Sequence, residues 1–130
     1  MNQMKRLEII SVAIWLRDHA KTASNAELLE KCSHLASFGV FSNRNLTKLI
    51  SGRLSHATIG RHTHKTTRNG GSIAPESLED IRDALFSKEA NKIDYEAIFR
   101  AMKRGTSQNM IAKLTGIPQS SISRKVNDAS

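Results

Sequence analysis

The stretch from Met110 to Asn127 constrains the fold more than any other part of this chain. Apolar residues recur at helical spacing on both sides of Gly116, and glycine is the residue that most readily ends a helix and turns the chain. We therefore predict a helix that ends at Gly116, a tight corner, and a second helix. The side chains expected to point inward are those of Ile111, Ala112, Ile117 and Ile122.

The second helix of this stretch has a polar outer face. The residues left facing outward are Gln119, Ser120, Ser123 and Arg124, with no acidic residue among them. This is the construction of a helix-turn-helix, whose second helix enters the major groove of DNA. Because Arg pairs with guanine and Gln with adenine through two hydrogen bonds, we expect Gln119, Ser120 and Arg124 to contact bases. Lys113 and Lys125 can contact phosphates.

The residues from Ala112 to Asn127 resemble the helix-turn-helix of lactose-repressor-family regulators, and they are similar also to that of DNA invertases and resolvases. The resemblance implies that Gln119, Ser120 and Arg124 contact bases. It implies as well that Ser121 and Asn127 contact phosphate or brace the motif. Thr115 and Lys125 stand where those families usually carry apolar residues. The resemblance covers this stretch alone, so it implies DNA binding and nothing about a ligand or partner.

A second stretch, Leu49–Arg61, has the same order of residue types. An apolar helix is followed by a glycine corner at Gly52, then by an apolar residue, a Ser or Thr, an Ile, a small residue and an Arg. The corner after Gly52 has one more residue than the corner after Gly116. We interpret this stretch as a divergent second helix-turn-helix. In this motif and in the loop that follows it, we expect these residues to contact DNA: Ser55, His56, Thr58, Arg61, His62, Lys65 and Arg68.

The remaining segments also have the period of helices, and none alternates as a half-buried strand does. We expect helices over residues 3–20, from a cap at Ser24, from a cap at Ser42, from Pro75 or Ser77, and from caps at Asp94 and Ser107. Residues 65–72 are polar and basic and contain glycine, which is typical of a linker. The predicted fold is all-α, with two small helical units at residues 1–66 and 75–130 joined by a linker at 67–74.

The charge pattern agrees with a nucleic-acid partner. The net charge is +8, which favours binding to a polyanion. No acidic residue occurs in residues 31–74 or 97–127, and an acidic block at residues 76–96 separates these basic blocks. Each basic block contains one of the two candidate motifs.

Other classes of function find less support in the sequence. His62 and His64, even with His34, His56 and Cys32, match no tetrahedral zinc pattern, and we see no catalytic constellation. The single cysteine excludes an internal disulfide, and the apolar run at residues 9–16 is too short to span a bilayer. We expect a cytoplasmic, nucleoid-associated protein that is not an enzyme and uses no cofactor or metal.

The predicted function is sequence-specific binding of double-stranded DNA, as a small transcription regulator of phage, plasmid or other mobile-element type. The alternatives are a DNA-packaging or replication-accessory protein that recognises a site, and an RNA-polymerase-associated factor whose acidic block contacts polymerase. An adaptor that binds an acidic protein is a further alternative. Either one chain grips two half-sites about one helical turn apart, or the apolar first helix forms a homodimer on a palindrome.

Overall fold

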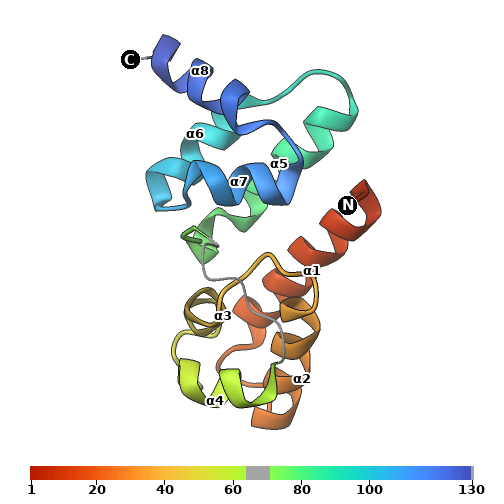
Figure 1. Ribbon diagram of the computed structural model, residues 1–130, viewed down its shortest axis with the longest axis vertical. Coiled ribbons are helices and arrows are strands. Elements are labelled where there is room, and N and C mark those ends of the chain that lie inside the picture. Colours follow the sequence, from red (N-terminus) through yellow and green to blue (C-terminus); the bar gives the residue numbers. More distant parts are fainter. Residues whose placement is uncertain (64–70, 130) are drawn as a thin grey trace. The chain divides into compact units, whose positions relative to one another are not determined.

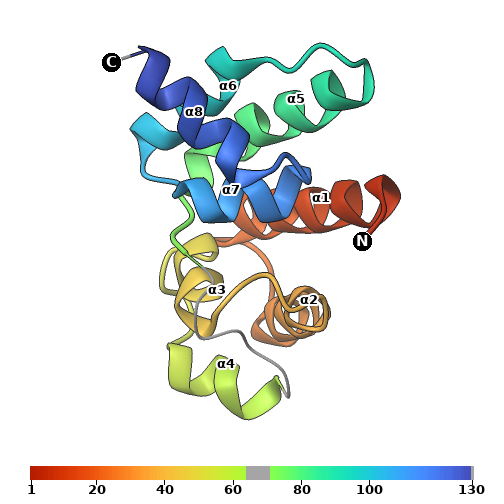
Figure 2. The ribbon, with the colours of Figure 1, turned by 45° about the horizontal axis from the view of Figure 1, so that its top comes forward.

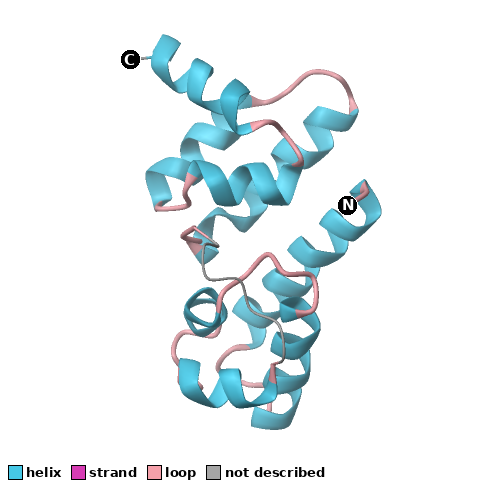
Figure 3. Cartoon of the chain, viewed as in Figure 1, coloured by secondary structure: helices cyan, strands magenta, loops and turns pink. Residues whose placement is uncertain are grey.

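A computed structural model describes residues 1–63 and 71–129, and within these ranges the chain is helical with no strand (Figures 1 and 3). The predicted all-α class is confirmed. In chain order the elements are α1 (Gln3–His19), α2 (Asn25–Ala36), α3 (Asn43–Leu49), α4 (His56–His62), the 3-10 helix η1 (Pro75–Ser77), α5 (Leu78–Glu89), α6 (Tyr95–Arg104), α7 (Gln108–Thr115) and α8 (Gln119–Ala129).

The chain divides into two compact units. The N-terminal unit is Ser11–Gly70, and the C-terminal unit combines Met1–Ile10 with Gly71–Ser130. Helix α1 therefore begins in one unit and ends in the other. The predicted division at residues 67–74 stays a prediction, because residues 64–70 lie outside the described ranges.

Most helices begin where the sequence places a capping side chain. The hydroxyl of Ser24 accepts a hydrogen bond from the Glu27 amide, and the Glu27 carboxylate accepts one from the Ser24 amide, which completes a capping box. The other side-chain caps are Ser42 on α3, Ser55 on α4, Asp94 on α6 and Ser107 on α7. The helix starts predicted at Ser24, Ser42, Asp94 and Ser107 are therefore confirmed. Each such cap stabilises its helix by about 1 kcal/mol.

The N-terminal unit packs α4 against both α2 and α3. Its fully buried side chains include Leu28, Leu35, Phe41, Leu46, Leu49 and Ile59. The Arg53 guanidinium ties the loop after α3 to the start of α2, because it donates to the carbonyls of Ala20 and Ala23 and to Oδ1 of Asn25. Arg53 is thereby held as a structural brace.

The C-terminal unit is built on α5, which packs against α6 and α7, while α8 packs against α6 and α7 (Figures 1 and 2). Buried polar groups here are paired. The hydroxyls of Ser77 and Thr106 lie 2.6 Å apart, and Thr106 Oγ1 also accepts from the Ala74 amide at 2.9 Å. These bonds fix the chain entering α5 against the corner between α6 and α7.

Burial on three of the helices differs from what apolar character alone would give. Ala112, expected to point inward, is only partly buried, since Ile111, Leu114 and Thr115 take the inner face of α7. Phe86 follows the buried Leu85 by one position, about 100° around the helix, and is 47% exposed. On α1 the side chains of Ile9, Ile10, Ala13 and Leu16 are buried, whereas those of Leu7, Val12, Ile14 and Trp15 are only partly buried.

Substitution of two glycines that have a left-handed backbone conformation would test the turns after α2 and α7. Gly116 has φ 76° and Gly39 has φ 73°, and an L side chain in this region costs about 1–2 kcal/mol. We expect Gly39→Ala to lower the free energy of unfolding by about that amount. Gly116→Ala should lower it by at least as much, because Arg6 and Lys88 would also have to move away from the new Cβ atom. A Cβ atom at Gly39 would meet nothing within 4 Å, so this variant is the control for backbone strain alone. Unchanged stability of Gly116→Ala in urea unfolding would contradict the left-handed turn.

Candidate nucleic-acid interface

The turn between α7 and α8 occupies residues 116–118. The amide of Gly116 donates to the Ala112 carbonyl at 2.8 Å, which closes α7. Thr115 is buried, and its hydroxyl donates to the Ile111 carbonyl at 2.7 Å and accepts from the Ile117 amide at 3.2 Å. Hydrogen bonds therefore fix both the end of α7 and the first residues of the turn.

Helix α8 is held to the unit by its apolar side. Ile122 is fully buried, and Ile117 in the turn is 1% exposed. Ser120, Arg124 and Asn127 follow one another at spacings of four and three residues, so they lie on one face of the helix. All three are exposed, as is Gln119 at the start of the helix. The structure thus brings four of the predicted site residues together on the solvent side of α8.

Three other residues predicted at DNA in this motif are not exposed on the outer face of α8. Ser121 and Ser123 are half-buried, and the Ser123 hydroxyl donates to Oε1 of Gln108 at 2.6 Å. This bond braces the start of α7 against the middle of α8. Lys113 on α7 is also half-buried.

Lys125 contacts α6 through its ammonium group. Its Nζ lies 5.2 Å from the ring centroid of Tyr95, at the distance of a cation–π contact. Lys125, through this contact, and Thr115, through the hydrogen bonds of its hydroxyl, each have a partner within the unit.

The basic block at residues 97–127 is not uniformly available to an anion. Asp80 on α5 accepts from Nε of Arg100 at 3.1 Å and lies 3.4 Å from Nε of Arg104. The hydrogen bond to Asp80 also raises the pKa of Arg100. A carboxylate of the acidic block therefore neutralises part of the basic block, whereas Arg124 is exposed on α8.

Two basic residues beside the turn were missed in the sequence. Cζ of Arg6 and Nζ of Lys88 each lie 2.8 Å from the position that a Cβ atom on Gly116 would take. Both belong to the C-terminal unit. No local pattern could have linked them, because they come from α1 and α5, far from Gly116 in sequence.

The second candidate motif, α3 and α4, has a different corner. Helix α3 ends at Leu49 and α4 begins at His56, so the corner spans residues 50–55, against 116–118 in the first. Between the glycine and the second helix there are three residues here, 53–55, against two, 117 and 118, in the first motif, so the predicted extra residue is present. Helix α3 also ends before Gly52 is reached. Ser51 and Gly52 both have positive φ, at 54° and 74°, and the chain needs further residues to reach the cap at Ser55. The two corners therefore differ in geometry.

The residues predicted on α4 separate into two groups. His56, Arg61 and His62 have exposed side chains. Ser55 and Thr58 serve the cap, because the Ser55 hydroxyl accepts from the Thr58 amide at 3.1 Å and lies 3.0 Å from Oγ1 of Thr58. The predicted residues Lys65 and Arg68 lie outside the described residues, as does His64 of the metal alternative.

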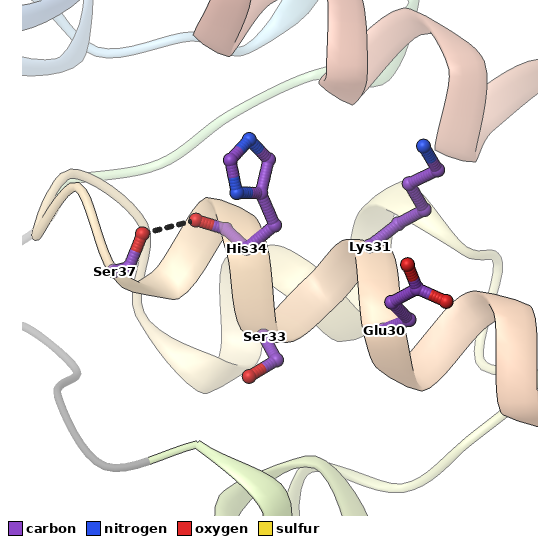
Figure 4. A pocket seen from close by; sticks show the side chains of 5 residues that line it. All are labelled: Glu30, Lys31, Ser33, His34 and Ser37. Carbon is purple, nitrogen blue, oxygen red and sulfur yellow. Dashed lines mark hydrogen bonds between the residues drawn. The ribbon is translucent and has the colours of Figure 1, made fainter.

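An open pocket lies along α2 (Figure 4), lined by Glu30, Lys31, Ser33, His34 and Ser37. Lys31 and His34 extend to one side of the helix and Ser33 to the other. Lys31 Nζ lies 5.3 Å from the Trp15 ring, and the Ser37 hydroxyl donates to the His34 carbonyl at 2.6 Å. Within residues 1–63 and 71–129, no group of three or more His, Cys, Asp or Glu side chains is placed to hold a metal ion.

No protein-family model, curated protein or solved structure matches this chain. The resemblance to helix-turn-helix regulators therefore stays a prediction. Among the described residues, no helix combines the length and apolar character that crossing a membrane requires.

Cys32 offers a test of the N-terminal core. Its side chain is fully buried, and burial raises the pKa of the thiol from 9.0 to about 12. Because the thiolate is the reactive species, we expect an aromatic disulfide reagent to react far more slowly with the folded chain than with the chain in denaturant. Equal rates would contradict burial of the thiol.

The same thiol affects stability only at high pH. Below pH 9.0 it is protonated in both the folded and the unfolded chain. Between pH 9.0 and about 12 the unfolded chain loses this proton first, so the thiol lowers stability as the pH rises.

Proposed function

We propose that this chain is a sequence-specific double-stranded DNA-binding protein that inserts α8 into the major groove. The observation that carries the proposal is the outer face of α8. Gln119, Ser120, Arg124 and Asn127 are exposed together, while Ile117 and Ile122 fix the helix from beneath. These side chains suit hydrogen bonding to base edges and phosphates.

The charge of the chain supports the same partner. A net charge of +8 attracts DNA at long range without regard to sequence. The exposed Arg124 supplies a guanidinium on the face that would contact bases. Sequence preference would therefore come from α8, and general affinity from the basic surface.

The biological role that we propose is regulation of transcription at the bound site. The support is the local resemblance of residues 112–127 to the motif of known regulators. A recognition protein for DNA packaging or replication, or a polymerase-associated factor, would use the same α8 surface.

The first test uses Arg124 and a duplex that the wild-type chain enriches from a random library. Arg124→Ala should weaken binding to this duplex by about 1–3 kcal/mol, the discrimination of one two-bond contact with guanine, and weaken binding to unrelated duplex much less. Fluorescence anisotropy titrations at fixed salt measure both affinities.

Arg124→Lys is the matched control, because it keeps the charge but loses the planar fork. It should lose preference for the enriched duplex while retaining affinity for unrelated DNA. Equal losses on both duplexes in Arg124→Ala would remove the base-contacting role. If the wild-type chain enriched no duplex, the proposed function would fail.

A second test asks whether α4 also contacts DNA. If it does, Arg61→Ala should weaken binding and shorten the nuclease footprint on the enriched duplex. Lys21→Ala is the control, since Lys21 is an exposed cation of the same unit that lies between α1 and α2. Should Arg61→Ala change neither affinity nor footprint, DNA binding by two motifs would be wrong and α8 would act alone.

A further inference from the structure

Two cationic groups of the C-terminal unit meet at the turn between α7 and α8. The Arg6 guanidinium carbon and the Lys88 ammonium nitrogen each lie 2.8 Å from the position of a Cβ atom on Gly116. Their separation cannot exceed twice that distance. Arg6, Lys88 and Gly116 are each only partly buried.

The pair is held by backbone carbonyls. Lys88 Nζ donates to the Gly116 carbonyl at 3.2 Å, and Nη1 of Arg6 donates to the Met1 carbonyl. Within residues 1–63 and 71–129, no carboxylate forms an ion pair with either side chain. Nε of Arg6 is buried and has no hydrogen-bond partner there.

The same unit shows how such a pair is otherwise neutralised. Arg100 and Arg104 also lie close together, and both bind the carboxylate of Asp80. Beside Gly116 no acidic side chain of the described ranges takes that place. Since like charges repel at short range, an anion with several oxygens would relieve the repulsion between these two cations.

We propose that Arg6 and Lys88 form a binding site for a phosphate group at the turn between α7 and α8. A guanidinium and an ammonium group together suit phosphate, because both are positively charged N–H donors. The site lies beside Gly116, three positions before Gln119, the first residue of α8. A phosphate held here fixes the position from which α8 enters a groove.

Two sources share this chemistry, a phosphate of the DNA backbone and free inorganic phosphate. The assignment to DNA rests on the proposed function, whereas the two-cation site does not. The test therefore has two arms, both with the full chain. Lys88→Gln and Arg6→Gln are the variants, and Lys92→Gln is the control, because Lys92 is an exposed lysine four positions beyond Lys88.

The first arm titrates inorganic phosphate at constant ionic strength and follows amide NMR shifts. In the wild-type chain and in Lys92→Gln we expect saturable shifts of the Gly116 and Gln119 amides. Both shifts should be lost in Lys88→Gln and in Arg6→Gln. The remaining spectrum of each variant reports whether it is folded.

The second arm measures how DNA affinity depends on salt. Loss of one phosphate contact lowers the slope of log affinity against log salt by about 0.9. We expect this change in Lys88→Gln and Arg6→Gln, on enriched and unrelated duplexes alike, and no change in Lys92→Gln.

The arms separate the two sources. An unchanged slope with a phosphate response that depends on Lys88 would assign the site to free phosphate and overturn the DNA assignment. If the wild-type chain bound no duplex but retained that response, the proposed function would fail and the site would stand. No phosphate response together with an unchanged slope would overturn the site.

Discussion

The buried side of the turn between α7 and α8 is the constraint on which the rest of this account depends. Ile117 and Ile122 are buried on either side of the start of α8, and Gly116 reverses the chain in a backbone conformation that other residues adopt at a cost. Thr115 satisfies its buried hydroxyl within the turn. Because these contacts fix the inner side of α8, its outer side is fixed as well, and a helix held in this way can present side chains to a rigid partner.

The cations of the C-terminal unit fall into two groups, those with partners inside the unit and those available to bind an anion. Arg100 and Arg104 bind Asp80, and Lys125 contacts the ring of Tyr95, so these cations stabilise the unit internally. Arg124 is exposed on the outer face of α8, while Arg6 and Lys88 converge beside the turn. The count of basic residues alone overstates the charge offered to an anion. What matters for binding is the smaller set of cations with which no carboxylate of residues 1–63 and 71–129 forms an ion pair.

Local signals explain why much of the fold could be predicted from the sequence. Ser55, Ser107 and Asp94 cap helices through bonds to residues three positions away, and Gly116 ends α7 at the expected place. The pairing of Lys125 with Tyr95 and the approach of Arg6 to Lys88 join residues distant in sequence, so no local pattern indicates them. No sequence pattern indicates that Ser51, which is not glycine, adopts a positive φ directly before Gly52.

The most direct test of the central claim is a map of amide NMR shifts in the full chain when a duplex enriched by that chain is added. We predict that the largest changes fall on the outer face of α8, at Gln119, Ser120, Arg124 and Asn127, and at the turn beside Gly116. Buried positions such as Ile122 should change less. Changes confined to the N-terminal unit, or none on α8 at saturation, would contradict the claim that α8 is the helix that binds DNA.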